Sequence, residues 1–347
     1  MKNIIINGVE IGSGKKPFII AEMSANHNQS LERALEIVDA AAAAGASAIK
    51  LQTYTPDTMT IPGAKVIQDD KSLWNGRELY DLYKEAYTPW EWHAPLFERA
   101  RAKGLIPFST PFDESAVDFL ETLNVGAYKI ASFENTDWPL LKKVALSGKP
   151  IIMSTGAATL GDLEEGVGVL RANGCKDLIL LKCTSSYPST PESTNLKTIP
   201  HLREMFNCHV GLSDHTMGIG VAVAAIALGA VVIEKHFTLR RADGGVDSVF
   251  SIEPEELKSL VVESERAFQA MGNISYGVLD AEKKTTLFKR SLFVVKDIKA
   301  GECFTKENVR VIRPSDGMKP KFYESVIGKK ASKDIVKGTP LTWEILF

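Results

Sequence analysis

The sequence predicts an α/β protein in which a (β/α)8 TIM barrel is followed by a small β-rich domain. Three observations predict this fold class. Eight short apolar runs alternate with segments of helical periodicity along most of the chain. A polar, lysine-rich stretch follows them, and beyond it a short motif occurs twice. The length of 347 residues accommodates one barrel and one such domain.

The eight apolar runs are typical of parallel strands buried on both faces, because apolar residues follow one another without regular alternation. We expect strands at residues 17–22, 47–52, 105–110, 126–131, 150–155, 178–183, 209–214 and 231–236. A doubly wound sheet is the alternative arrangement of alternating strands and helices. It is disfavoured because no GxGxxG loop follows the first run.

Helix boundaries are marked by capping residues between these runs. Segment 31–44 is preceded by Ser30, a favourable N-cap, and is followed by Gly45. Segment 89–103 is preceded by Thr88, which we expect to cap it. Helices of this kind, one after each strand, form the outer layer of a barrel.

The chain is predicted to divide into a barrel domain (residues 1–272), a linker (273–290) and a C-terminal domain (291–347). Within the last, KDIKAGECFTKEN (296–308) is echoed by KDIVKGTPLTWEI (333–345), with Lys, Asp, Ile, Gly, Thr and Glu at the same offsets. This repeat predicts a pseudo-symmetric, mostly β domain with short turns. It can bury little core alone, so we expect it to pack on a partner or on the barrel.

The composition excludes several functional classes. A net charge of −2 argues against a nucleic-acid partner, which would usually require a basic excess. The longest apolar stretch, 221–233, is too short to span a membrane, and no secretory signal is visible. The four cysteines lack CxxC spacing, which favours reduced thiols in a cytoplasmic protein.

Polar residues gather at the carboxyl ends of the predicted strands, which form the mouth of a barrel where chemistry takes place. They are Glu22, Lys50, Gln52, Ser109, Thr110, Lys129, Ser132, Ser154, Thr155, Lys182, Thr184, Ser185, Ser186, Ser213, Asp214, His215, Glu234 and His236. The lysines Lys50, Lys129 and Lys182 are predicted to converge there. Because a buried ammonium group is costly without an anion, they imply a phosphate or carboxylate ligand. For Lys50 alone, the alternative is a structural ion pair with a neighbouring carboxylate.

Two histidines, His215 and His236, close consecutive predicted strands, beside Asp214 and Glu234. Paired imidazoles at adjacent strand ends are typical of an open metal site. Two protein ligands leave positions for water and substrate, as Lewis-acid catalysis requires. The alternative is a pair of hydrogen-bonded core histidines. Asn75, in the loop between the second and third strands, is either placed to contact substrate or part of an ordinary surface turn.

The motifs as a set resemble the sialic acid synthase family, which condenses phosphoenolpyruvate with an amino sugar to make nonulosonic acids. The resemblance covers essentially the whole chain and rests on IIAEMSANHNQS (19–30), IKLQTYTPD (49–57), FSTPFD (108–113), YKIASFE (128–134), STGAAT (154–159), KCTSSYPS (182–189), GLSDHTMG (211–218) and EKHFT (234–238). The C-terminal repeat, with RPSDG (313–317), resembles the antifreeze-like (SAF) domain of that family. The resemblance implies a domain-swapped homodimer.

The resemblance also implies roles for individual residues. His215 and His236 would hold a divalent metal, manganese or magnesium, with cobalt as a further candidate. Glu22 and Glu234 would handle protons and position water. The phosphoenolpyruvate site would be formed by Lys50, Thr110, Lys129, Ser132, Ser154, Ser185 and Ser213. The sugar would contact Gln52, Asn75, Tyr187 and Asp247, and Arg313 would reach the site from the partner subunit.

Two segments indicate a branch of the family. RRADGGVDSVFSIEP (240–254) stands where the neuraminate synthases have a Gly-Pro-Asp-His stretch, and LWNGRELYDLYKEAYTPWEWH (73–93) follows the second strand. Both resemble the pseudaminic acid synthase branch, whose acceptor is 2,4-diacetamido-2,4,6-trideoxy-L-altrose. The alternatives are an N-acetylneuraminate or legionaminate synthase, a Schiff-base aldolase using Lys129 or Lys182, and a non-enzymatic carbohydrate-binding protein.

Overall fold

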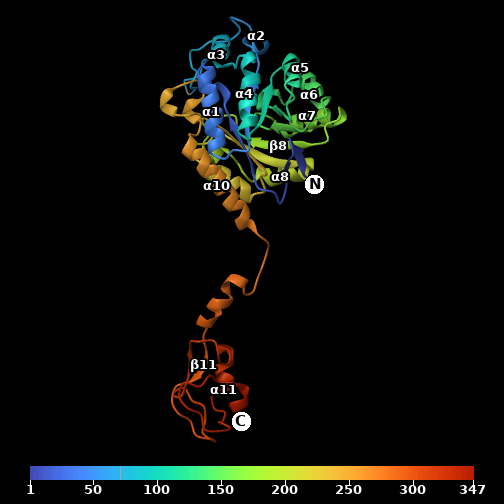
Figure 1. The fold of residues 1–347 in the computed structure, drawn as a ribbon. Coiled ribbons are helices and arrows are strands. Elements are labelled where there is room, and N and C mark those ends of the chain that lie inside the picture. The colour runs from blue at the N-terminus through green and yellow to red at the C-terminus, as the bar shows by residue number, and fades with distance from the viewer. Residues whose placement is uncertain (71) are drawn as a thin grey trace. The chain divides into compact units, whose positions relative to one another are not determined.

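The computed structural model describes residues 1–70 and 72–347. The chain forms two compact units, Met1–Gly272 and Asn273–Phe347 (Figure 1). Within the described residues, no helix combines the length and the apolar character that a membrane crossing requires.

The first unit is a closed barrel of eight parallel strands, in the order β10-β3-β4-β5-β6-β7-β8-β9. The strands are β3 (Phe18–Glu22), β4 (Ala48–Thr53), β5 (Ile106–Pro111), β6 (Tyr128–Ile130), β7 (Ile151–Ser154), β8 (Leu178–Cys183), β9 (His209–Asp214) and β10 (Val232–His236). The predicted TIM barrel is therefore confirmed. All eight strands lie within a residue or two of the predicted runs.

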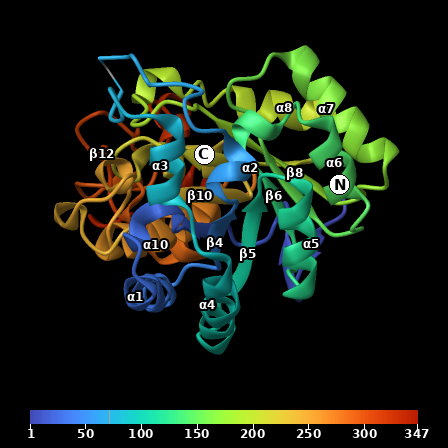
Figure 2. The same ribbon diagram turned by 90° about the horizontal axis from the view of Figure 1, so that it is seen from above.

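Helices surround the strands, and α1, α4 and α5 lie outside β4 and β5 (Figure 2). They are α1 (Leu31–Ala43), α2 (Pro56–Met59), α3 (Leu79–Ala86), α4 (Trp90–Ala102), α5 (Glu114–Thr122), α6 (Trp138–Ala145), α7 (Leu160–Ala172), α8 (Thr198–Phe206), α9 (Gly220–Ala227) and α10 (Pro254–Met271). The predicted cap of α1 is confirmed, because the Ser30 hydroxyl accepts a hydrogen bond from the Arg33 amide. The predicted cap of α4 is wrong. Pro89 takes the N-cap position, and the Thr88 hydroxyl instead lies 3.2 Å from Nε2 of His27.

Side chains alternate between two cores along each strand. Ile179 and Leu181 of β8 belong to the cluster inside the barrel, whereas Leu178 and Leu180 pack against the helices. The same alternation holds on the other strands, so a shift of one residue moves a side chain from the barrel interior to the outer layer.

An N-terminal hairpin closes one end of the barrel. It consists of β1 (Ile4–Ile6) and β2 (Val9–Ile11), joined by Asn7 and Gly8, both at positive φ. Ile4, Ile6 and Ile11 belong to the interior cluster of the barrel. Nε2 of His209, at the start of β9, lies 2.9 Å from the Lys2 carbonyl oxygen. The Asn-Gly turn was a hairpin signal in the sequence. Because the hairpin covers the amino ends of the strands, the carboxyl ends form the open mouth.

The second unit contains β11 (Ser291–Val294), β12 (Val309–Ile312), the short helix α11 (Tyr323–Val326) and its own hydrophobic cluster. The two copies of the repeat pair reciprocally. Ile298 and Ile335 exchange two backbone hydrogen bonds of 2.8 Å. The Asp334 carboxylate accepts a hydrogen bond from the Ala300 amide, and the Asp297 carboxylate accepts one from the Lys337 amide. Ala300 and Lys337 are equivalent positions, each three residues after the Asp of its own copy. The predicted pseudo-symmetry is thus confirmed.

Candidate active site

Two lysines and two glutamates form a buried charge cluster at the carboxyl ends of β3, β4, β6 and β10. Nζ of Lys50 lies 2.6 Å from Oε2 of Glu22 and 3.4 Å from Oε1 of Glu234. Nζ of Lys129 lies 3.8 Å from the same Glu234 oxygen. All four side chains occupy the inward register and are almost completely buried. Lys50 therefore does form ion pairs, but they lie inside the mouth and belong to the cluster.

The two glutamates of this cluster have opposite protonation tendencies. Burial raises the pKa of Glu22 to about 6, and the nearby Glu234 charge adds to this against the opposing effect of Lys50. Burial acts on Glu234 in the same direction, but the ammonium groups of Lys129 and Lys50 outweigh it and lower the pKa of Glu234. Glu22 is thus suited to carry a proton and Glu234 to remain a carboxylate. Neighbouring carboxyl groups whose pKa values are pushed apart in this way are typical of acid–base sites.

Hydroxyl groups from neighbouring strands complete the cluster. The Thr110 hydroxyl accepts a hydrogen bond of 3.1 Å from Lys50, and the Ser154 hydroxyl accepts one of 2.7 Å from Lys129. The Ser213 hydroxyl donates to Glu234 at 3.3 Å. Ammonium and hydroxyl donors that converge in a water-poor site are suited to bind an oxyanion.

Two further serines meet above the backbone of Gly156. A Cβ atom at this glycine would collide with the hydroxyls of both Ser132 and Ser185. The Asn135 side chain holds the same turn by donating 3.2 Å to the Gly156 carbonyl oxygen. Only glycine therefore allows the loops after β6, β7 and β8 to bring these hydroxyls together.

The predicted histidines lie next to this cluster, because His236 pairs with Glu22 in the register of β10 and β3. The ring centroids of His215 and His236 are 5.3 Å apart, and the ring of Tyr187 lies 4.4 Å from that of His215. Nδ1 of His215 donates 2.9 Å to the Thr184 carbonyl oxygen, which leaves the lone pair on Nε2. Burial, followed by the charges of His215 and Lys50, holds the pKa of His236 well below its ordinary value, so this imidazole is neutral.

These imidazoles fit a divalent metal with an open coordination sphere. Nδ1 of His236 is buried and has no hydrogen-bond partner among the residues that the structure describes. A backbone carbonyl that fixes the orientation of a ligating histidine, as Thr184 does for His215, is common at metal sites. Over residues 1–70 and 72–347, no group of three or more His, Cys, Asp or Glu is placed to hold a metal. The protein therefore offers two ligands, and substrate or water would have to supply the others.

A hydrogen-bonded chain of Asp247, Ser24 and Gln52 lies beside the histidines. Oδ2 of Asp247 lies 4.0 Å from Nδ1 of His236 and accepts a hydrogen bond from the Ser24 hydroxyl. The Gln52 amide donates 3.1 Å to the same Ser24 oxygen. Burial raises the pKa of Asp247, although the Ser24 hydrogen bond opposes this.

Asn75 is placed differently from its predicted role. It is exposed, and its amide oxygen and nitrogen bond within their own loop, to the Asp69 amide and the Asp70 carboxylate. The neighbouring Trp74 connects this loop to the site, because its ring centroid lies 5.9 Å from that of Tyr187. Its indole nitrogen also donates 3.2 Å to the carbonyl oxygen of Val246.

Two residues that were predicted to lie at the mouth point out of the barrel, towards the helices. Lys182 lies in the outward register of β8, and its ammonium group donates to the Cys183 carbonyl and the Thr184 hydroxyl. Asp214 lies in the outward register of β9, where it forms a buried ion pair of 2.8 Å with Lys235. The prediction that Lys182 converges with Lys50 and Lys129 is therefore wrong, as is the placement of Asp214 beside the imidazoles.

Two residues of the site were missed. Cys183 takes the inward position on β8, and contacts with His215 outweigh burial and lower its pKa to about 6. Glu134 carries a buried Oε2 that has no hydrogen-bond partner within the described part of the chain. Burial raises the pKa of Glu134 to about 7, and Lys129 is the strongest opposing charge. Strand alternation could have identified Cys183. Glu134 lies in the 3-10 turn Ser132–Glu134, where that alternation has ended.

Arg313 lies in the second unit, on the loop that follows β12. Its guanidinium carbon is 5.9 Å from the ring centroid of Phe288 in the same unit.

The chain is similar in sequence to known proteins. Residues 37–276 match the NeuB family, and residues 289–346 match the SAF domain. The pseudaminic acid synthase of Campylobacter jejuni is 48% identical, over 94% of this chain and 96% of that protein. The pseudaminic acid synthase of Helicobacter pylori is 44% identical over the same shares of the two chains. The N,N'-diacetyllegionaminic acid synthase of Campylobacter jejuni is 38% identical, over 92% of this chain and 97% of that protein.

A solved structure has the same architecture. The N-acetylneuraminic acid (sialic acid) synthetase from Leptospira borgpetersenii, in complex with citrate, superposes with a TM-score of 0.73. It is 34% identical, and the alignment covers 82% of this chain and 95% of that chain.

Proposed function

The chain belongs to the NeuB family, and on that premise we propose that it condenses phosphoenolpyruvate with an acetamido sugar to give a nonulosonic acid and phosphate. The proposed acceptor is 2,4-diacetamido-2,4,6-trideoxy-L-altrose and the product pseudaminic acid, because the relatives with 48% and 44% identity are pseudaminic acid synthases. A legionaminate or N-acetylneuraminate synthase is the alternative, and the legionaminic acid synthase is a more distant relative at 38%.

The observation that carries the proposal is the charge cluster beside the paired imidazoles. Lys129 and Lys50 present ammonium donors among the hydroxyls of Thr110 and Ser154. We propose that the phosphate and carboxylate of phosphoenolpyruvate bind these groups, with further contacts from Ser132, Ser185 and Ser213. A doubly anionic substrate would supply the negative charge that the donors of this cluster are arranged to bind.

His215 and His236 would hold the divalent metal, manganese or magnesium, and a metal bound there would supply Lewis-acid polarisation of the acceptor's carbonyl. The protein side chains then have to orient the two substrates. Asp247 and Gln52, linked through Ser24, would position the sugar hydroxyl and acetamido groups. The ring of Tyr187, next to both histidines, would exclude water from that side.

The reaction forms one carbon–carbon bond and breaks one carbon–oxygen bond. C3 of phosphoenolpyruvate attacks the acceptor's aldehyde carbon, and the aldehyde oxygen takes up a proton. Water adds to C2, forming the C–O bond that replaces the bond to phosphate. Phosphate leaves with the bridging oxygen, and the added oxygen gives up both of its protons as the C2 ketone forms, one to the former aldehyde oxygen and one to phosphate. Glu22, whose pKa is raised to about 6, is suited to give a proton. Glu234, a carboxylate, is suited to orient and deprotonate the water, and Glu134 at a pKa of about 7 can relay protons near Lys129.

The protein is further proposed to act as a homodimer in which Arg313 of one subunit completes the site of the other. This proposal rests on the family resemblance of the RPSDG loop (313–317) and on the SAF domain match. Arg313 pairs with no carboxylate among the described residues, so its guanidinium group is available to an anionic or carbonyl-bearing ligand.

Phosphate release tests the proposal. The protein is incubated with manganese, phosphoenolpyruvate labelled with 18O at the bridging oxygen, and a panel of acetamido sugars. We expect rapid phosphate release only with the altrose derivative, with the label in the phosphate. Faster release with a legionaminate or neuraminate precursor would favour the alternative, and no release with any sugar would contradict the proposal. Borohydride treatment with pyruvate should trap no adduct, since the proposed reaction forms no Schiff base. A Schiff-base aldolase would instead be labelled on Lys129.

A further inference from the structure

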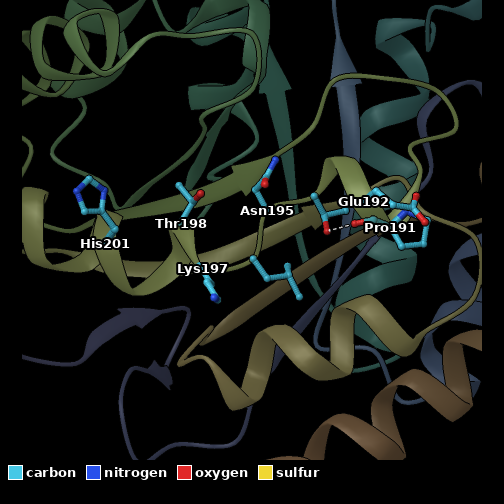
Figure 3. Close-up of a pocket in the computed structure, with 8 residues that line it drawn as sticks. Pro191, Glu192, Asn195, Lys197, Thr198 and His201 are labelled. Carbon is cyan, nitrogen blue, oxygen red and sulfur yellow. Dashed lines mark hydrogen bonds between the residues drawn. The ribbon is translucent and has the colours of Figure 1, made fainter.

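A hollow lies beside the mouth of the barrel, between the β7–α7 turn and the segment that joins β8 to α8. Its outer half, of about 630 Å³, is formed by residues 191–201, including Glu192, Lys197 and His201 (Figure 3). Its inner half, of about 610 Å³, is reached across Thr198 and His201, which line both halves. We call the two halves together the β7–β8 groove. Its volume suits a small metabolite of the size of a sugar phosphate.

Lys182 provides the charge of the groove. Its side chain is half-buried, and its ammonium group donates 2.8 Å to the Cys183 carbonyl oxygen and 3.0 Å to the Thr184 hydroxyl. Both acceptors are neutral, and no ion pair joins Lys182 to a carboxylate in the part of the chain that the structure describes. Lys50 and Lys235, by contrast, are each paired with a carboxylate. A partly desolvated ammonium group with a free N–H attracts an anion.

The lining of the inner half matches an anion that also carries hydroxyl groups. None of its lining residues is Asp or Glu, and Glu192 lines only the outer half. Besides Lys182 and the imidazole of His201, the inner half presents six hydroxyl-bearing side chains: Thr155, Thr159, Thr184, Ser185, Ser193 and Thr198. A polyhydroxylated ligand could exchange hydrogen bonds with these hydroxyls, which act both as donors and as acceptors.

We propose that the β7–β8 groove is a second ligand site, which binds a small polyhydroxylated anion, a sugar phosphate or a sugar acid, through the ammonium group of Lys182. The site adjoins the proposed phosphoenolpyruvate cradle and shares the Ser185 hydroxyl with it, but its ammonium group is a different one. Lys182 occupies the outward register of β8, whereas the cradle lysines Lys50 and Lys129 occupy the inward register of β4 and β6.

The groove meets the catalytic side at Cys183, Thr184 and Ser185, which all line its inner half. The Thr184 hydroxyl accepts from Lys182, while the Thr184 carbonyl accepts from Nδ1 of His215. A ligand that draws Lys182 away from Thr184 is therefore expected to shift the imidazole of His215. This coupling rests on the proposed function, because it assumes that His215 binds a metal. Coupling between two sites typically changes affinity about fivefold or more, in both directions.

Calorimetry on the full-length Lys129→Met protein tests the binding site, because that variant lacks the ammonium group of the cradle. Ribose 5-phosphate and gluconate are titrated separately, and neutral ribose serves as the ligand control. We expect at least one anion to bind about tenfold or more tightly than ribose. Adding Lys182→Met should abolish that preference, and adding Lys176→Met, an exposed lysine at the opposite end of β8, should not.

The exposed His201→Gln variant provides a second test should Lys182→Met fail to fold, and it should weaken binding of the same anion. Equal affinity of both anions and ribose for the Lys129→Met protein would overturn the proposal, as would binding that survives both Lys182→Met and His201→Gln. The coupling is read from manganese affinity of the otherwise unaltered protein with and without the bound anion. Unchanged manganese affinity would overturn the coupling. A protein that binds the anion but no manganese would contradict the proposed function while leaving the groove intact.

Discussion

Two buried groups of charges lie at the same end of the barrel, one inside it and one outside, and they are built on opposite principles. Outside, Lys235 donates 2.8 Å to Asp214 and 2.7 Å to the Thr216 carbonyl oxygen, and the second Asp214 oxygen accepts from the amide and hydroxyl of Thr216. Inside, Oε2 of Glu234 has no hydrogen-bond partner within the described residues, although two lysines approach its other oxygen.

The difference shows how buried charges that stabilise the fold can be told apart from buried charges that bind a ligand. The charges of the outer pair neutralise each other at 2.8 Å, so the pair offers no net charge to a ligand and serves to join the ends of β9 and β10. The inner cluster is left partly unsatisfied, which is costly unless a ligand completes it. Removing a charge should therefore cost activity inside the barrel and stability outside it.

Lys129→Met should have the largest effect on activity. It removes one donor to the developing and departing oxyanion, so kcat/KM is expected to fall by about 10³. The free energy of unfolding should change by no more than about 1 kcal/mol, because Glu234 keeps its ion pair with Lys50. Steady-state kinetics and urea unfolding measure the two quantities. A large loss of stability would mean that the inner cluster is structural after all.

Lys235→Met should show the reverse pattern. It leaves Asp214 as a buried, unpaired carboxylate, and we expect the free energy of unfolding to fall by about 3 kcal/mol. The double variant Lys235→Met/Asp214→Leu should recover part of this loss, because it removes both charges. Thermal and chemical unfolding provide the measurement. A Lys235→Met protein that keeps its full stability and binds metal normally would show that the outer ion pair is not needed for the fold. The outer pair could then no longer be called structural in contrast to the inner cluster.

His236→Ala should weaken manganese binding by about 100-fold and lower the rate in proportion, with the fold intact. The reason is the loss of one of the two imidazoles, His215 and His236, that would hold the metal. Calorimetry with manganese and circular dichroism separate the two effects. If the variant unfolds while the metal affinity of the remaining folded protein is unchanged, His236 is a core residue.

Glu22→Gln should change how stability depends on pH. The folded-state pKa of Glu22 is raised to about 6 from an ordinary 4.5, mainly by burial, so the folded protein favours the protonated form. Its stabilising contribution is present below pH 4.5 and is lost as the pH rises through about 6. Relative to the otherwise unaltered protein, Glu22→Gln should therefore gain about 2 kcal/mol between pH 4.5 and pH 7.5. Urea unfolding at the two pH values checks this, and parallel curves would contradict it.

Arg313→Ala should have the smallest effect, a fall in kcat of about tenfold, as expected for the loss of one charge-assisted contact to substrate. The measurement is turnover together with sedimentation, so that loss of the homodimer can be told apart from loss of the contact. Mixing Arg313→Ala with Lys129→Met subunits should restore activity if each site takes its arginine from the partner. Unchanged kinetics would contradict a role for the SAF domain in the site.

Much of the fold and of the candidate site could be predicted from the sequence. Continuous apolar runs located all eight strands, and the residues at their ends supplied the inner cluster and both histidines. The prediction went wrong where it did not apply the alternation of faces strictly up to the strand ends. Lys182 and Asp214 stand one position from Cys183 and His215, and that single position separates the helix-facing layer from the mouth.

Other features lie outside the strands and helices, where no regular alternation of side chains predicts their orientation. Glu134 follows β6 in a 3-10 turn, so neither strand nor helix alternation could orient it. Its raised pKa comes from burial by distant segments, which only the folded chain reveals. The N-terminal hairpin, by contrast, was signalled by Asn7-Gly8, and its docking beneath the barrel depends on long-range packing of Ile4, Ile6 and Ile11.

The most direct test of the inner cluster is a crystal structure of the protein with manganese and phosphoenolpyruvate. The phosphate and carboxylate groups are expected on Lys129, Lys50 and the hydroxyls around them, with Nε2 of His215 and the ring of His236 on the metal. Phosphoenolpyruvate bound elsewhere, or imidazoles turned away from it, would contradict the assignment of the barrel mouth as the active site.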